Sequence, residues 1–224
     1  MTSMNFAGFD RSDFPGLPVM RWLTQNTNLK WCGFYLGPAP SHPYSSWMEQ
    51  RIPLMAQGWG LAPIYVGQQE VGPGSREVTV ARGDVDGKDA ASLMEKAGFP
   101  KGSYVYLDLE NGPPLTIQQR GYVSAWSTSL EAAGYKTGVY CSFLFAEDVA
   151  KMLPSARIWA FHVKTVDRHR VSGKVFSSAA PGACGFPGAF VWQYDDEALI
   201  ECPLSATGVL LVDLDVASTA DPSS

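Results

Sequence analysis

The stretch Ser103-Tyr104-Val105-Tyr106-Leu107-Asp108-Leu109-Glu110 combines β-branched and aromatic residues with two carboxylates at its end. Such residues predict a β-strand, in which successive side chains point to opposite faces. Asp108 and Glu110 therefore lie on one face, roughly 6–7 Å apart along the strand, and Leu107 and Leu109 lie on the other. Two neighbouring acids at the end of a buried strand repel each other, so one of them keeps its proton to a higher pH. Such a carboxyl can act as a general acid near neutral pH.

Short apolar runs alternate with helical patterns on both sides of this stretch. Strands are predicted at residues 5–10, 30–36, 60–66, 103–110, 136–141, 157–163, 189–194 and 209–213. Helices are predicted at residues 17–27, 44–57, 84–97, 116–133 and 144–153. Strands that alternate with helices indicate parallel βαβ units. Residues 218–224 are expected to fray.

Four acids lie at the ends of predicted strands: Asp10, Asp108, Glu110 and Asp213. A closed barrel brings the carboxyl ends of its strands to one face, where these side chains would meet. We therefore predict an α/β fold, a TIM-like (β/α) barrel with eight strands and fewer than eight helices. No linker divides the chain, so residues 1–224 are expected to form a single domain. An open doubly wound sheet is less favoured, because no glycine-rich phosphate loop follows the first strand.

Composition excludes several classes of protein. The net charge is −5 and basic residues form no run, which argues against a nucleic-acid partner. No stretch approaches the ~18 apolar residues of a membrane span. The first residues lack a secretory leader pattern, so the localisation stays open, and export by a non-classical route or delivery to the cell wall is considered. Seven Trp, nine Tyr and eleven Phe suit either a sugar-stacking groove or an aromatic core.

The cysteines and histidines offer no obvious metal site. Cys184 and Cys202 lie in loop-like sequence and either form a disulfide or stay reduced, and the other two cysteines lie in strand patterns. No metal or cofactor is expected, since no paired Cys or His spacing is present. His42, His162 and His169 are too badly spaced for a metal-dependent phosphodiesterase. The chain also lacks the G-x-S-x-G pattern of a serine hydrolase.

Five short motifs occur in a fixed order: Gly8-Phe9-Asp10, Tyr106-Leu107-Asp108-Leu109-Glu110, Trp159-Ala160, Trp192-Gln193-Tyr194 and Val212-Asp213-Leu214-Asp215. Together they resemble glycoside hydrolase family twenty-five, the lysozymes that cut peptidoglycan between N-acetylmuramic acid and N-acetylglucosamine. Over about residues 5 to 216, the chain more closely resembles a bacterial glycoside hydrolase-like domain of unknown function that is related to those lysozymes. The resemblance implies an acidic groove at the carboxyl ends of the strands and a polysaccharide substrate.

The resemblance also implies roles for the four acids. Glu110 is expected to be the general acid that protonates the glycosidic oxygen. Asp108 is expected either to stabilise the developing positive charge or to orient the substrate acetamido group as an internal nucleophile. Asp10 and Asp213 are expected to line the same cleft.

Five further residues at strand ends are predicted to contact the substrate: Tyr65, Gln68, His162, Trp192 and Tyr194. Trp192 and Tyr194 share one face of a strand, where Tyr194 could stack on a sugar ring, with core packing as the alternative. His162 could bind a substrate hydroxyl or have a structural role.

Two departures from the lysozyme pattern leave the activity open. Asp215, expected to be exposed or to cap a turn, stands where those lysozymes commonly carry Asn, and His162 stands where an aromatic residue is expected. Glu110 could also pair with Arg120 and have no catalytic role. The favoured function is a glycosidase that cleaves an amino-sugar polysaccharide, with peptidoglycan as the expected substrate. The alternative is a non-catalytic carbohydrate-binding barrel that keeps the acidic groove, and in either case a monomer is expected.

Overall fold

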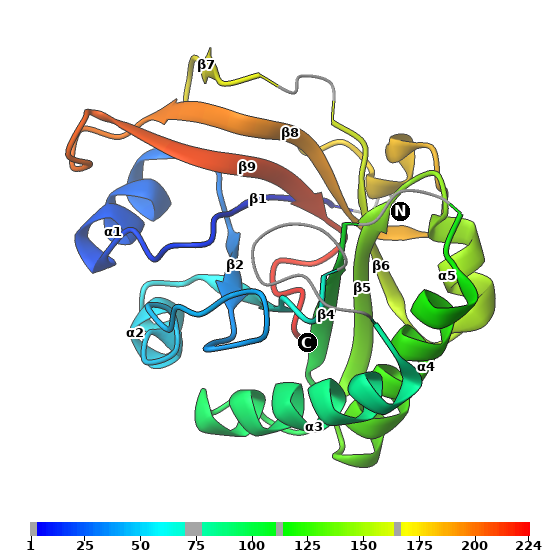
Figure 1. The fold of residues 1–224 in the computed structure, drawn as a ribbon. Helices are drawn as coiled ribbons and strands as arrows, with labels where there is room; N and C mark the ends of the chain where they lie inside the picture. The colour runs from blue at the N-terminus through cyan, green and yellow to red at the C-terminus, as the bar shows by residue number, and fades with distance from the viewer. Residues whose placement is uncertain (1–3, 70–77, 111–113, 164–166) are drawn as a thin grey trace.

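The computed structural model describes residues 4–69, 78–110, 114–163 and 167–224, which form nine strands and five α-helices (Figure 1). The strands are β1 (Phe6–Asp10), β2 (Trp31–Tyr35), β3 (Gly60–Tyr65), β4 (Tyr104–Leu109), β5 (Lys136–Ser142), β6 (Arg157–Phe161), β7 (His169–Val171), β8 (Ala189–Glu201) and β9 (Val209–Ala217). The helices are α1 (Leu17–Asn26), α2 (Arg51–Ala56), α3 (Val80–Lys96), α4 (Ile117–Ala132) and α5 (Ala146–Met152), with a short 3₁₀ helix η1 (Pro181–Cys184).

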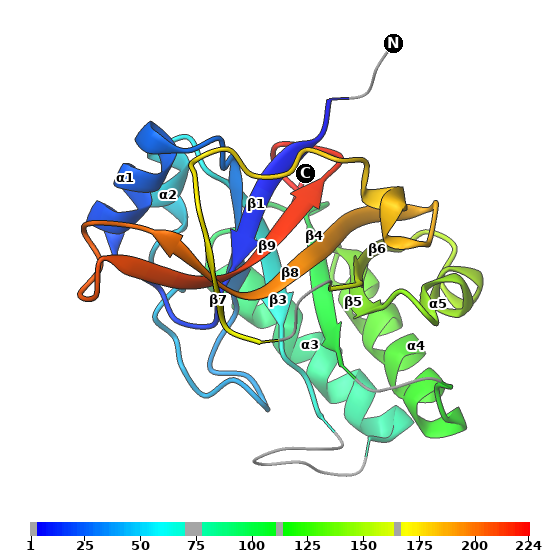
Figure 2. The same ribbon diagram turned by 90° about the horizontal axis from the view of Figure 1, so that it is seen from above.

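Eight of the strands close into a mixed barrel. Their order is β6-β5-β4-β3-β2-β1-β9-β8, and the pairing of β6 with β8 closes the ring, while β7 adds to β8 outside it. The predicted TIM-like barrel with eight strands and fewer than eight helices is confirmed. The expectation of parallel units throughout is wrong for β9, which runs antiparallel to β1 and β8 (Figure 2). A short connection joins β8 to β9, and strands joined in this way pair antiparallel.

The helices pack against the outside of the barrel. Helices α3, α4 and α5 lie along one side and α1 and α2 along another (Figure 1). Helix α4 begins at a capping box, in which the Thr116 hydroxyl accepts from the Gln119 amide and the Gln119 side chain accepts from the Thr116 amide. It ends before Gly134, whose φ of 89° is left-handed. Among the described residues, no helix is both long and apolar enough to cross a lipid bilayer.

Aromatic rings fill the barrel interior. Trp159 is fully buried and meets Trp31, Tyr106 and Tyr140 edge to face, with ring centroids 5.4–5.6 Å apart. Glycines on neighbouring strands make room for these rings, since a Cβ at Gly8 would overlap the Trp31 indole. Edge-to-face pairs of this kind stabilise a core beyond the area they bury. The rings form one buried cluster inside the barrel, below the end at which β1 and β4 finish.

The C-terminal residues seal the opposite end. The Tyr104 amide donates to the Ser223 carbonyl (2.8 Å), the Ser223 amide donates to the Leu61 carbonyl (2.9 Å), and the Tyr106 hydroxyl donates to the Pro222 carbonyl (3.1 Å). The prediction that residues 218–224 fray is therefore wrong. Their polar composition suggests a loose tail, but their backbone satisfies barrel groups that would otherwise be unpaired.

All four cysteines are buried, free thiols. The disulfide considered between Cys184 and Cys202 is not formed. Burial raises the pKa of the Cys141 thiol.

Candidate active site

The four acids predicted to be catalytic line one cavity at the mouth of the barrel. The cavity measures about 40 Å³ and is lined by Asp10, Tyr35, Ile64, Asp108, Glu110, Tyr140, Trp159 and Asp213. Asp10 ends β1, Asp108 lies near the end of β4 and Glu110 follows it, so these three lie at the carboxyl ends of parallel strands. This is the end at which barrel enzymes build their active sites.

The position of Asp213 within its strand differs from the prediction, although its side chain does line the cavity. It lies in the middle of β9 rather than at its end, and the antiparallel register pairs it with Asp10. Residues that are paired on neighbouring strands point to the same face, so both carboxyls enter the cavity. Two residues further on, Asp215 points the same way and is paired with Gly8, which has no side chain to compete for the space.

Asp215 lies below the cavity and is fully buried. The expectation of an exposed or capping Asp215 is therefore wrong. The Trp159 indole donates to its Oδ1 (2.9 Å), and its carboxyl hydrogen-bonds to Asp10. Burial, and then the charges of Asp10 and Asp213, raise the pKa of Asp215 well above its usual range. Asp215 thus acts as a protonated donor to Asp10.

Asp10 is held by two donors. The Tyr35 hydroxyl donates to its Oδ1 (2.6 Å), and Asp215 donates from below. Burial raises the pKa of Asp10 to about 6, these two bonds oppose the rise, and the charge of Glu110 adds to it. Asp10 is therefore an oriented carboxylate at neutral pH.

Asp108 and Glu110 form the second pair of acids. Asp108 is 9% exposed, and its Oδ1 has no hydrogen-bond partner among the described residues. Burial, and then the charges of Glu110 and Asp10, raise the pKa of Asp108 well above its usual range. Glu110 lies more exposed at the rim, where desolvation by the cavity walls and then the charge of Asp196 raise its pKa. Arg120 bonds to Asp148 (3.2 Å), which leaves Glu110 without this cation.

A bulge in β8 places a further acid beside Asp213. Between Gln193 and Ala198 the register with β9 shifts, and Glu197 adopts a left-handed φ of 50° that non-glycine residues rarely take. The Glu197 amide donates to Asp213 Oδ1 (2.9 Å). Burial, and then the charge of Asp10 and the hydrogen bond to Asp196, raise the pKa of Asp213 to about 9. Asp196 could not be predicted from the sequence, because a bulge has no clear sequence signal.

None of the five residues predicted to contact the substrate is among the described residues that line the cavity. The Tyr65 hydroxyl donates to Asp89 on α3 (2.9 Å), so Tyr65 points away from the barrel interior. The Gln68 backbone amide donates to the Tyr122 hydroxyl of α4 (2.9 Å).

The other three predicted contacts lie on the outer face of the barrel. The Trp192 indole donates to the His162 carbonyl (3.1 Å), and the Tyr194 hydroxyl accepts from the Ser177 amide (3.3 Å). The His162 ring stacks on Phe143. A role of any of the five in substrate binding stays a prediction.

Sequence reasoning missed the polar residues that do face inward. Gln193, which lies between the two outward-facing aromatics, accepts from the Tyr140 hydroxyl, and Tyr140 and Tyr35 line the cavity. Tyr140 is paired with Trp159 on neighbouring strands and so lies on the same inner face.

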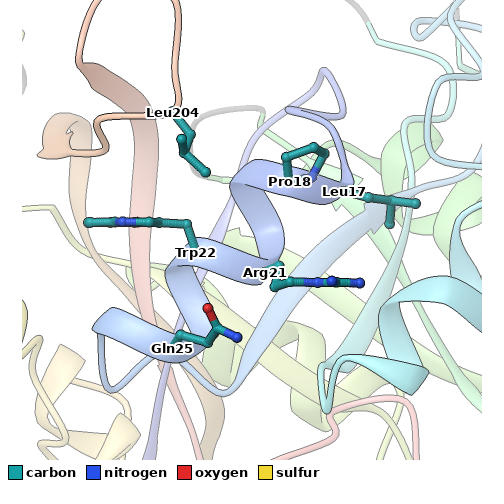
Figure 3. Close-up of a pocket in the computed structure, with 6 residues that line it drawn as sticks. All are labelled: Leu17, Pro18, Arg21, Trp22, Gln25 and Leu204. Carbon is teal, nitrogen blue, oxygen red and sulfur yellow. The ribbon is translucent and has the colours of Figure 1, made fainter.

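The described residues lack the arrangement that a metal ion needs. Within those ranges, no three His, Cys, Asp or Glu side chains are arranged to hold a metal ion. A larger hollow of about 350 Å³ lies between α1 and the β8–β9 hairpin (Figure 3). Its lining includes Trp22, Arg21 and Leu204 but no carboxyl group, so it cannot supply a general acid.

Comparisons with known proteins agree with this architecture. A sequence model of the Rv2525c-like, glycoside hydrolase-like domain matches residues 23–178, which is more than half of the chain. A search of curated proteins finds no match to this chain.

Several solved structures share the fold. An uncharacterised protein of B. stearothermophilus is 20% identical, with a TM-score of 0.65 and 95% of each chain covered. The Tat-secreted protein Rv2525c of Mycobacterium tuberculosis, in complex with L-tartrate, is 14% identical, with a TM-score of 0.61 and coverage of 96% of this chain and 95% of that one. A bacterial lysozyme from Streptomyces coelicolor is 14% identical, with a TM-score of 0.57 and coverage of 94% and 90%. These likenesses concern the fold alone.

Proposed function

The chain belongs to the Rv2525c-like, glycoside hydrolase-like domain family, and from this premise we propose that it hydrolyses an amino-sugar polysaccharide by carboxylate general acid catalysis. The observation that carries the proposal is the pairing of Glu110, at the rim, with Asp108, whose Oδ1 is buried and unpartnered among the described residues. A shared fold with a bacterial lysozyme supports peptidoglycan as the first substrate to test.

Glu110 is the proposed proton donor because it lies at the open edge, where a glycosidic oxygen can approach. The charge of Glu110 raises the pKa of Asp108, so the pair binds a proton at a pH where an isolated carboxyl would lose it. A positive charge that develops on the sugar next to Asp108 favours the ionised form of Asp108. The shared proton then resides on Glu110, from which it passes to the leaving oxygen.

The remaining groups stabilise the oxocarbenium-like transition state. The glycosidic carbon–oxygen bond breaks as the Glu110 proton moves to the leaving oxygen, and water later adds to the anomeric carbon and loses its proton to a carboxylate of the cavity. Asp10 is fixed by Tyr35 and adds a second negative charge next to that carbon. The buried rings of Trp31, Tyr106 and Trp159 provide an apolar surrounding next to the cavity, which strengthens the effect of these charges.

The test uses purified peptidoglycan and chitin-type oligomers, with reducing ends and product masses as the readouts. We expect wild-type protein to release new reducing ends and Glu110→Gln to lose at least about a hundredfold of that rate. Glu95→Gln, which removes an exposed carboxyl on α3, is the matched control and should retain full activity. Equal release by wild type and Glu110→Gln would rule out this acid. Sugar binding without release by either protein would favour the carbohydrate-binding alternative.

A further inference from the structure

An acidic groove extends outward from the catalytic cavity. It measures about 320 Å³ and is lined by Asp10, Arg11, Ser12, Asp13, Asp196, Glu197, Leu211, Val212 and Asp213. Asp10 and Asp213 also line the cavity, so the two spaces share a wall. The groove is large enough for a sugar ring, whereas the cavity has room for only one or two water-sized groups.

Negative charge dominates this space. Five of its nine lining residues are acids, and Arg11 is the one cation among them. Arg11 donates to the Leu211 carbonyl (3.4 Å) and is thereby drawn toward the hairpin. Glu197 is paired with Arg168 (3.3 Å), but Asp10 and Asp196 have no ion pair within the described ranges.

An independent observation at the inner end points to a missing partner. Asp108 Oδ1 is buried, faces the cavity and has no hydrogen-bond partner in the described part of the chain. An unpartnered buried carboxylate oxygen is costly, and a donor that also carries positive charge would offset both the lost hydrogen bond and the repulsion from Asp10 and Glu110.

We propose that the cavity and groove together bind a hexosamine whose amine is free and protonated, with the ammonium against Asp108 and the sugar ring in the groove. This inference rests on the proposed function and specifies its substrate class as a partly or fully de-N-acetylated amino-sugar polymer. An ammonium is compact and donates three hydrogen bonds, whereas an acetamido group would bring a carbonyl and a methyl into about 40 Å³ lined by carboxyls. A free amine provides no acetamido nucleophile, so the anomeric carbon must be attacked either by a carboxylate of the cavity or by water that loses its proton to one.

A divalent cation is the competing occupant, but the described acids lack the arrangement that a metal ion needs. A primary amine on a peptide is a second source of the same chemistry. The test therefore includes both as separate arms.

The experiment measures affinity by calorimetry at low ionic strength, at a pH where the amine is protonated. The probes are a fully de-N-acetylated chitosan tetramer, its N-acetylated counterpart, a lysine-containing tetrapeptide and CaCl₂. We expect wild type and Glu110→Gln to bind the chitosan tetramer at least about tenfold more tightly than the N-acetylated one, with the preference weakening as salt rises. Asp196→Asn should reduce that preference about tenfold, and Asp13→Asn, at an exposed position on the facing wall, should reduce it severalfold. Glu95→Gln should leave it unchanged.

Equal affinity for the two tetramers, or an unchanged preference in both groove variants, would overturn the inference. Equal binding of the tetrapeptide, or binding of calcium in place of the amine, would also overturn it. The result is separable from catalysis, because release of N-acetylated products without a chitosan preference leaves the proposed function standing. A groove-dependent preference without any cleavage supports the inference and rejects the proposed function.

Discussion

Replacing Asp10 with asparagine should remove a pH-dependent penalty on the stability of the barrel. Asp10 is 4% exposed, and burial raises its pKa from 3.8 to about 6. Such a carboxyl binds its proton more tightly in the folded state, so its stabilising contribution is complete below about pH 4 and is lost as the pH rises through 6. At about 1.4 kcal/mol for each pKa unit, the loss is about 3 kcal/mol.

Asparagine has no charge to desolvate and keeps one oxygen that can accept the Tyr35 hydroxyl bond. The difference in unfolding free energy between Asp10→Asn and wild type should therefore shift in favour of the variant by about 2.4 kcal/mol between pH 4 and pH 7, because the carboxyl of the unfolded chain is already partly ionised at pH 4. Urea unfolding at constant ionic strength, at four pH values across this range, measures that difference. Glu95→Gln, which changes the same charge at an exposed site, should give a difference that does not vary with pH. A flat profile for Asp10→Asn as well would refute the assignment of this penalty to Asp10.

Three further changes test how the site is built. Gly33→Ala should cost about 1–3 kcal/mol in urea unfolding, because the new Cβ would lie 2.6 Å from the Cβ of Asp10; a neutral result would mean that β1 and β2 can move apart. Tyr35→Phe removes a bond that lowers the pKa of Asp10, so the carboxyl resonance of Asp10 in NMR titration should move to a higher pH, and no movement would contradict that bond. Thr116→Ala removes the cap of α4 and should cost about 1 kcal/mol without changing any titration, whereas Thr116→Ser should restore it.

Local sequence predicted much of the fold. The alternation of apolar strands and helices from β1 to β6 follows from residue periodicity and from helix stops such as Gly134. Both signals depend only on residues that are close together in the sequence, so they can be recognised without the structure. The direction of β9 depends on its short connection to β8 and on pairing with β1 at the other end of the chain. Strand periodicity alone cannot reveal which way a strand runs. Asp213 was expected at a strand end because the strand was predicted to stop there, whereas β9 continues to Ala217.

The candidate site, like the fold, could be predicted from the sequence only in part. Asp108 and Glu110 could be paired from their spacing, because both belong to one strand. The outward direction of Trp192 and Tyr194 could not be read in the same way, since two aromatic side chains suit either the inner or the outer face of a barrel strand. Asp215 was expected at the surface because nothing adjacent to it in sequence indicates the Trp159 indole that bonds to it.

The pairing of β1 with β9 has a consequence for biosynthesis. Asp10 and Asp213 are separated by about two hundred residues and meet only through this ladder, so their contact is of very long sequence range. Contacts of this kind form late and slow the folding reaction, because a large loop must close first. A nascent chain on the ribosome holds Asp10, Asp108 and Glu110 well before it holds Asp213. We therefore expect the complete set of acids to assemble only once synthesis has passed β9.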